Sequence, residues 1–299
     1  MSNIDQLAQN PYPSVSPGVD KIRRRWVSID SMAGVGIDPD VSKIPAEIWM
    51  EAGEHASVSD VMTLFNKRII DATAEHTVDY KVNSNFFQGE AGRRALAETF
   101  AYLKTTQPDV VRICDGKFAD VGHTADKISD EIFGELDADG VLLNPYMGVD
   151  AIQPFTKWAN KIIVLCINTS NPSAAEIQDL PLANGQPLWK YILEKSMNEW
   201  NEHGNILPVL SATHPKNLDG IRDIVGDTPI LLAGIGTQGG DLATSVTKTL
   251  DSQGYGLMIS ASRAILYPDR LPGESLQDAS ARSVVTLKDA INDAKQVDS

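Results

Sequence analysis

The sequence is poor in the residues that most often form covalent or metal-bound cross-links. It contains only two cysteines, Cys114 and Cys166, and both lie inside apolar runs that favour β-strands. We interpret them as reduced core thiols rather than as a disulfide or a nucleophile. Its histidines show no zinc-ligand spacing, so we predict no structural metal. These histidines are His55, His76, His123, His203 and His214.

Long hydrophobic runs and an excess of basic charge are also absent. The longest aliphatic run, around 162–167, is far too short to cross a bilayer. The first residues lack a basic region followed by an apolar core, so we expect no signal peptide and a cytoplasmic location. Lysine and arginine total 26 against 40 acidic residues, which gives a net charge of −14. This balance argues against nucleic-acid or anionic-membrane partners, and any substrate phosphate must be held by a local site.

Short apolar runs alternate regularly with longer amphipathic ones. Eight strand candidates, nearly all followed by a helical pattern, predict a single-domain α/β fold of the closed (β/α)8 TIM-barrel type. We expect residues 1–20 to form a polar, extended arm and residues 21–299 to form the barrel. The alternative is an open doubly wound sheet, but no glycine-rich dinucleotide turn follows the first strand. The expected strands are 33–38, 78–87, 110–115, 140–144, 161–168, 206–212, 229–234 and 256–260, and the expected helices are 59–74, 92–105, 124–136, 188–202, 218–225, 241–253 and 280–295.

One long insertion interrupts this alternation after the fifth strand, at residues 171–187. Long loops that follow barrel strands lie on the catalytic face. We therefore interpret this insertion as a candidate lid over the active site.

The most informative stretch is VVRICDGKFADVGHT, residues 110–124. Strand alternation places Asp115 and Lys117 side by side at the end of the third strand. Asp120 lies beyond the strand, so its side chain is free to face a different pocket. The stretch has a simpler interpretation, a solvated salt bridge at a strand end, and the motif alone does not decide between them.

Other strand ends carry polar groups, as a barrel enzyme requires. Asp38 ends the first strand, and Lys81 and Asn83 share one face of the second. Hydroxyls of Thr169 and Ser170 follow the fifth strand and could bind a planar ring. The glycine-rich run GIGTQGGD, 234–241, follows the seventh strand and Arg263 follows the eighth, a combination that commonly binds phosphate.

Taken together, these segments resemble the orotidine 5'-phosphate decarboxylase family, in particular its longer bacterial branch. The resemblance spans about residues 33–268. It rests on seven segments in the family's order, namely GIDPD, KVNSNFF, DGKFADVGHT, NPYMGVDAIQPF, TSNPSA, GIGTQGGD and SRAI. The chain departs from the family pattern at Asn168, Ser173 and Ala233, which affects the fifth and seventh loops more than the charged array.

The resemblance implies a role for each matched residue. The family's alternating Lys-Asp-Lys-Asp array corresponds to Lys81, Asp115, Lys117 and Asp120. In such an array Lys117 stabilises a carbanion at C6 of the pyrimidine and then protonates it, without a cofactor. The active unit is expected to be a homodimer in which Asp120 and Thr124 complete the neighbouring site. The remaining expected substrate contacts are Asp38 and Lys81 at the ribose hydroxyls, Ser170 at the pyrimidine, Gln238 between base and phosphate, and Gly239, Gly240 and Arg263 at the phosphate. Asn83 is a further expected substrate contact, with no part of the substrate assigned to it.

Two other functions remain open from the sequence. A Mg²⁺-dependent sugar-phosphate decarboxylase or aldolase of the same superfamily would also carry an Asp-x-Lys-x-x-Asp strand. A non-catalytic nucleotide sensor could retain the barrel, although binding alone would not need two ammonium groups and two carboxylates together.

Overall fold

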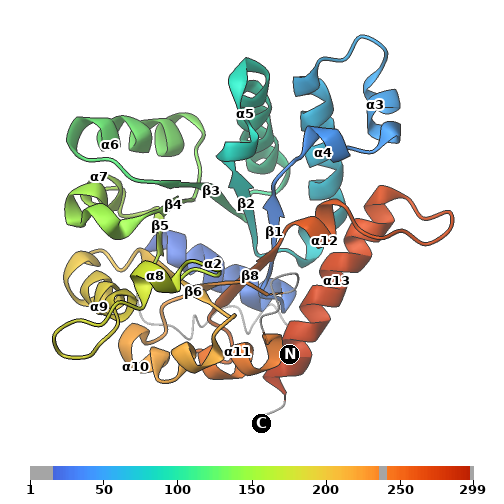
Figure 1. Cartoon of the computed structure of the whole chain (residues 1–299). Coiled ribbons are helices and arrows are strands. Elements are labelled where there is room, and N and C mark those ends of the chain that lie inside the picture. Colours follow the sequence, from blue (N-terminus) through green and yellow to red (C-terminus); the bar gives the residue numbers. More distant parts are fainter. Residues whose placement is uncertain (1–15, 236–240, 297–299) are drawn as a thin grey trace, which may run out of the picture.

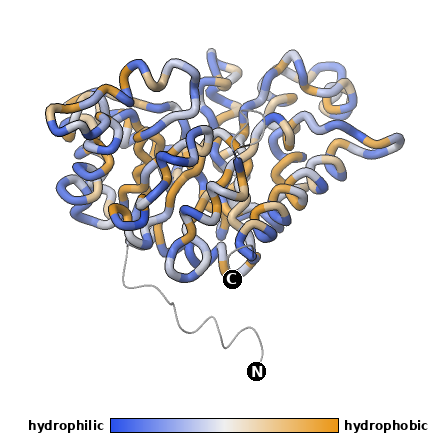
Figure 2. Tube along the Cα trace, turned by 60° about the horizontal axis from the view of Figure 1, so that its bottom comes forward, coloured by the Kyte–Doolittle hydropathy of each residue, from blue (hydrophilic) through white to orange (hydrophobic). Residues whose placement is uncertain are grey.

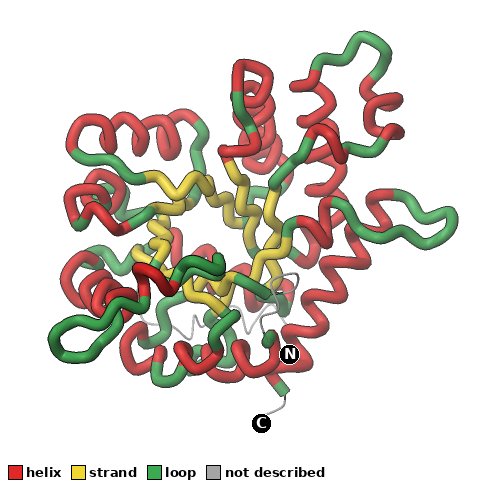
Figure 3. Tube along the Cα trace, in the orientation of Figure 1, coloured by secondary structure: helices red, strands yellow, loops and turns green. Residues whose placement is uncertain are grey.

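The computed structural model describes residues 16–235 and 241–296, and these form a closed parallel barrel of eight strands. Each strand pairs with the next along the chain, and β1 pairs with β8, so the predicted (β/α)8 barrel is confirmed. Viewed along its axis, the ring of strands is surrounded by helices (Figure 3). The strands are β1 Ala33–Ile37, β2 Asp79–Asn83, β3 Val111–Phe118, β4 Gly140–Leu143, β5 Ile162–Cys166, β6 Ile206–Ser211, β7 Ile230–Ala233 and β8 Leu257–Ala261.

Apart from β2 and β3, which carry charged side chains, the strands are mostly apolar because both of their faces are buried, one in the barrel and the other against the helices. Apolar residues follow the strands and the inner sides of the helices, whereas hydrophilic residues dominate the outer turns (Figure 2). The helices that cover the barrel are α4 Val58–Thr73, α5 Gly89–Thr106, α6 Gly122–Ser129, α7 Gln153–Thr156, α9 Leu188–Lys195, α10 Ile221–Val225, α11 Leu242–Thr249 and α13 Leu276–Lys295. A π-helical turn extends α6 over Asp130–Glu135 and another extends α9 over Ser196–Trp200.

Helix α2, Pro17–Ile29, covers the end of the barrel where the strands begin, and lies behind the ring in Figure 1. Lys21 pairs with Asp139 at 2.8 Å, just before β4. Arg23 donates to the carbonyl of Asp227 before β7. Ile22 and Trp26 are fully buried on the inner side of the helix. The helix begins four residues before the boundary of the predicted arm, so residues 17–20 are helical rather than extended, and residues 1–15 lie outside the described part.

Two strand boundaries differ from the sequence-based expectation. The second strand ends at Asn83 instead of continuing to residue 87, because Asn83 Oδ1 accepts a hydrogen bond from Asn85 N and starts a 3-10 turn, Ser84–Phe86. The third strand continues through Phe118 instead of ending at Asp115. Three further short helices lie in loops that follow strands, namely α3 Ala46–Ala52, α8 Ala175–Gln178 and α12 Arg263–Leu266.

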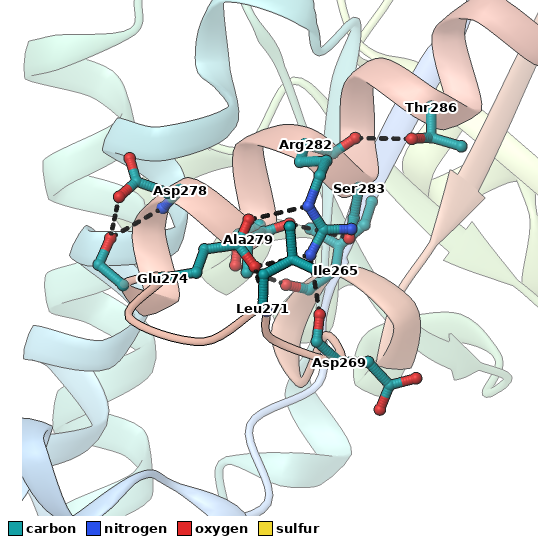
Figure 4. A network of polar contacts seen from close by, with 11 residues as sticks. Ile265, Asp269, Leu271, Glu274, Asp278, Ala279, Arg282, Ser283 and Thr286 are labelled. Carbon is teal, nitrogen blue, oxygen red and sulfur yellow. Dashed lines mark hydrogen bonds and ion pairs between the residues drawn. The ribbon is translucent and has the colours of Figure 1, made fainter.

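The loop between α12 and α13 is folded by one ion-pair network (Figure 4). Glu274 accepts hydrogen bonds from Arg282 and from the backbone of Leu271, each at 2.8 Å. Arg282 also donates to the carbonyl of Asp269. The Ser280 hydroxyl on α13 donates to the carbonyl of Ile265 on α12, so the network fixes the short helix that begins with Arg263. No helix within the described ranges is long and apolar enough to span a membrane.

Candidate active site

Two adjoining cavities form one cleft at the end of the barrel where the strands finish. The larger has a volume of about 600 Å³ and the smaller about 310 Å³. They share lining residues from β1, β7 and β8 or their ends, namely Asp38, Gly234, Ser260 and Ser262. The cleft therefore gathers residues from strands that are far apart in sequence, as the barrel prediction requires.

A chain of three charged groups lines the larger cavity. Lys81 Nζ donates to Asp115 Oδ2 at 2.9 Å, and Lys117 Nζ donates to Asp115 Oδ1 at 2.9 Å. The Asp115 side chain is only 2% exposed, Lys81 is 15% exposed and Lys117 is 51% exposed. Burial of the central carboxylate excludes a solvated surface salt bridge, so the simpler interpretation of this stretch is wrong.

The ion pairs shift two of these groups toward their charged forms. Burial alone would raise the pKa of Asp115, but the positive charges of Lys81 and Lys117 outweigh it and lower the pKa. Burial alone would lower the pKa of Lys81, but Asp115 and Asp38 outweigh it and raise the pKa. The barrel therefore keeps a buried carboxylate and a buried ammonium group ionised next to each other.

Lys117 holds its position through an unusual backbone. Its φ angle is +49°, in the left-handed region that side chains other than glycine, asparagine and aspartate rarely adopt. The register between β3 and β4 shifts between Asp115 and Phe118, which marks a bulge. Inside this bulge Gly116 lies against the Phe118 ring, and an added Cβ would approach the ring within 2.2 Å. The bulge turns Lys117 back toward Asp115, and such strained backbone is typical of functional sites.

Neutral polar groups also line the larger cavity. Thr169, Ser170 and Asn171 lie after β5, Asn83 ends β2 beside Asp115 of β3, and Asn144 follows β4. Gln178, on helix α8 of the 171–187 insertion, was not identified from the sequence. Its side chain accepts from Thr169 N at 2.9 Å and donates to Thr169 Oγ1 at 2.7 Å. The insertion is thus fastened to the end of β5, and α8 lies across the front of the ring in Figure 1.

The smaller cavity holds Arg263, one of the residues expected at a phosphate. Arg263 lines it together with Gly234 and Ile235, and Lys43 adds a second cation. Tyr267 accepts a hydrogen bond from Asp40 N at 2.7 Å and so ties the loop after β1 to the end of α12. Gln238, Gly239 and Gly240 lie outside the described residues.

Asp38 stands where the two cavities meet, as the sequence predicted for a ligand contact. Its Oδ1 atom is buried and accepts no hydrogen bond from the residues that the structure describes. A buried carboxylate oxygen without a donor is costly, and a ligand hydroxyl would supply one.

Asp120 and Thr124 do not line either cavity of their own chain. Asp120 follows β3 and accepts a hydrogen bond only from the neighbouring Val121 N among its recorded hydrogen bonds. Thr124 is exposed on α6, and Val121 between them is 40% exposed. The expectation that Asp120 faces a different pocket, and completes a partner's site together with Thr124, stays a prediction.

The two cysteines are unpaired, and both are held in the thiol form. Burial raises the pKa of Cys114 to about 12 and that of Cys166 to about 11. Cys114 belongs to the core, whereas Cys166 is partly buried and lines the larger cavity. Within 16–235 and 241–296 no group of three or more histidine, cysteine or acidic side chains is arranged to bind a metal ion.

Comparison with known proteins points to one family. The model of the orotidine 5'-phosphate decarboxylase / HUMPS family matches residues 59–278. The chain is 38% identical over 277 residues to orotidine 5'-phosphate decarboxylase of Cellvibrio japonicus, covering 93% of this chain and 98% of that protein. The solved structure of Leishmania donovani OMP decarboxylase matches with a TM-score of 0.77 and 26% identity, over 93% of this chain and 98% of that one. Leishmania donovani UMP synthase matches with a TM-score of 0.79 and 28% identity over 94% of this chain, which spans 57% of the length of that protein.

Proposed function

The chain belongs to the orotidine 5'-phosphate decarboxylase / HUMPS family and is a carboxy-lyase like its named relatives, and we propose that it converts orotidine 5'-phosphate into UMP and CO2. The reaction would need no cofactor and would serve pyrimidine nucleotide synthesis in the cytoplasm. The single observation that carries the proposal is the buried Asp115 carboxylate between two ammonium groups, at 2.9 Å from each.

The chemistry asks for a fixed positive charge beside one carbon atom. Cleavage of the bond between C6 and the carboxylate carbon leaves its electron pair in the ring plane at C6, where the pyrimidine π-system cannot delocalise it. The Lys117 ammonium group would stabilise this pair and then transfer a proton to C6, which gives UMP and a neutral amine that regains its proton from water. Catalysis of so slow a reaction requires a barrier reduction on the order of 20 kcal/mol.

Asp115 has a separate task in this scheme. It holds both ammonium groups through charge-assisted hydrogen bonds, so little reorganisation is needed when charge develops at C6. It would also lie near the substrate carboxylate, and repulsion there would be relieved as CO2 leaves.

The rest of the cleft suits the remaining parts of a nucleotide. Asp38 and Lys81 would bind the ribose hydroxyls, one of which could donate to the buried Asp38 Oδ1 atom. Asn83 lines the same cavity. Ser170 would bind the pyrimidine. Arg263, together with Gln238, Gly239 and Gly240, would bind the phosphate and use that remote binding energy to organise the charged array.

A second subunit would complete each site. Asp120 and Thr124 do not line the cleft of their own chain, and Val121 between them is exposed. We propose a homodimer in which these two residues enter the partner's larger cavity, with Asp120 as the fourth charge of the array.

The test is a spectrophotometric assay that follows loss of the orotate chromophore of orotidine 5'-phosphate, with UMP identified as product. Activity that persists after treatment with EDTA is the expected result. Activity abolished by EDTA and restored by Mg²⁺ would favour the sugar-phosphate enzyme instead. Tight UMP binding without turnover would favour the nucleotide sensor.

A further inference from the structure

A buried acidic residue lies beneath the charged array and is not used by the mechanism above. Asp79 is the first residue of β2 and is fully buried, with no exposed surface. Strand alternation places it on the same inward face as Lys81 and Asn83, one step deeper in the barrel. It does not line either cavity.

Asp79 is held by a contact that crosses a strand. The Ser260 hydroxyl on β8 donates to Asp79 Oδ2 at 3.1 Å, and β1 lies between these two strands. Gly34 of β1 is paired with Ser260, and the register of β1 with β2 sets it beside Asp79. A Cβ at Gly34 would lie 2.3 Å from Asp79 Oδ1 and 2.6 Å from Ser260 Oγ, so only glycine leaves room for this hydrogen bond.

The other oxygen of Asp79 has no donor. Asp79 Oδ1 is buried and accepts no hydrogen bond within the described part of the chain. Burial of a carboxylate with only one hydrogen-bonded oxygen is unfavourable, and a neutral side chain such as serine or leucine would cost less free energy to bury at this position. The charged side chain on the same face of β2 is that of Lys81, two residues further along the strand.

We propose that Asp79 is a positioning residue that acts from the barrel interior on the Lys81 ammonium group and fixes its place in the charged array. The inference rests on the proposed function for the catalytic part, because Lys81 is assigned there to the site. Asp79 itself lines neither cavity of the cleft.

The surrounding charges support this assignment. Burial raises the pKa of Asp79 to about 6, against the lowering effects of the Ser260 hydroxyl and of Lys81. Asp79 is in turn one of three carboxylates that raise the pKa of Lys81, with Asp115 on β3 and Asp38 after β1. Strand β8 contributes only the Ser260 hydroxyl to this group. Ionisation of Asp79 near pH 6 should therefore change the electrostatic environment of the Lys81 ammonium group.

The first part of the test measures the pH dependence of the Lys81 NMR signal, and it does not depend on catalytic turnover. Protein labelled with ¹³C at lysine Cε is titrated by NMR, and the Lys81 signal is the one lost in Lys81→Arg. We expect this signal to shift through a midpoint near pH 6 in the wild type, and the step to be absent in Asp79→Asn. Ser260→Ala removes the hydroxyl that lowers the Asp79 pKa, so its midpoint should move to higher pH. Asp126→Asn, which changes an exposed carboxylate paired with Lys157, should keep the wild-type step.

The second arm measures kcat and KM for orotidine 5'-phosphate from pH 5 to 8. Wild-type kcat should fall about tenfold as pH drops through the Asp79 pKa, whereas Asp79→Asn should show the lower value at every pH with KM nearly unchanged. An unaltered Lys81 titration in Asp79→Asn, or in Ser260→Ala if the first variant does not fold, would overturn the proposal. If the wild type shows no turnover, the proposed function fails, and the NMR arm still decides the role of Asp79.

Discussion

Both carboxylate oxygens of Asp115 contact the Lys117 ammonium group, at 2.9 and 3.1 Å, although the two residues are separated by only one position on β3. In a regular strand, side chains two residues apart point in parallel and do not converge so closely. The positive φ of Lys117 and the bulge after Asp115 bring them together. The charge geometry of the site is therefore built into the backbone of a single strand.

Lys117→Ala should retain the fold but lose several orders of magnitude in kcat, because it removes both the positive charge and the proton donor. Lys157→Ala, which breaks the exposed pair with Asp126, is the matched control and should leave kcat unchanged. Steady-state kinetics and thermal unfolding measure the two effects. A Lys117→Ala rate within a factor of ten of wild type would contradict the assignment, since this is only about 1.4 kcal/mol of barrier.

Asp115→Asn should lower both activity and stability. It leaves the Lys81 ammonium group buried without its main partner, at an expected cost of about 3–5 kcal/mol in the free energy of unfolding. Adding Lys81→Met in the same chain should recover most of the stability but none of the activity. Denaturant unfolding of the two variants measures this, and equal stability for both would argue against a coupled pair.

The pH dependence of stability should change in the same Asp115→Asn variant. The folded-state pKa of Asp115 is lowered, so its ion pairs stabilise the fold above the unfolded pKa of about 3.9 and lose this contribution as pH falls through the folded pKa. We expect wild-type stability to decline more steeply below about pH 4 than that of Asp115→Asn. The free energy of unfolding in urea is measured for both proteins from pH 3 to 5. The same dependence on pH in both would be evidence against this ionisation.

Arg263→Ala should act mainly on phosphate binding. We expect kcat/KM for orotidine 5'-phosphate to fall about a hundredfold, as for loss of a charge-assisted hydrogen bond worth roughly 3 kcal/mol. The penalty should shrink strongly for orotidine, which lacks the phosphate. The comparison uses kcat/KM for both substrates in both proteins, and equal penalties would place Arg263 outside the phosphate site.

Mixed subunits should test the shared site. Lys117→Ala and Asp120→Ala chains, each inactive alone, are unfolded together and refolded at equal concentrations. If Asp120 serves the partner's cleft, half of the dimers are mixed and each contains one intact site, which restores about a quarter of wild-type activity. No recovery in a mixture that refolds to dimers would place Asp120 in its own chain's site.

Asp79→Asn should stabilise the protein at neutral pH. The raised pKa of Asp79, about 6, means that the folded state favours the protonated form. The protonated Asp79 carboxyl therefore contributes to the free energy of unfolding in full below its unfolded pKa, and this contribution disappears as pH rises through about 6. The variant should therefore gain up to about 3 kcal/mol over wild type at pH 7.5 and almost nothing at pH 4. Urea unfolding at both pH values measures the gain, and an equal difference at both would exclude a titrating carboxyl.

The barrel and most of the site could be predicted from the sequence because both depend on local patterns. Alternating apolar runs identify parallel strands, and residues just after them must meet at one end of the ring. Asp38, Lys81, Asp115 and Lys117 were found in this way, and the structure brings them together in one cleft. The roles of these residues toward a substrate, and those of Asp120 and Thr124 toward a partner, remain predictions.

Features that depend on distant contacts could not be predicted. The hydrogen bond of Asp79 could not be predicted, because its partner Ser260 is 181 residues away. Gln178 lies in an insertion without periodicity, and its role depends on a hydrogen bond to the end of β5. The left-handed backbone conformation of Lys117 could not be predicted from the sequence either, because lysine rarely adopts it.

The bond from Ser260 to Asp79 has a consequence for how the chain is assembled. Strand β8 is the last to emerge from the ribosome, and it closes the ring by pairing with β1, the first. Without that final strand the Asp79 carboxyl would lack its recorded hydrogen-bond donor, because Ser260 belongs to β8. Closure of the ring and burial of this carboxyl therefore depend on the same strand, the last of the eight in the sequence.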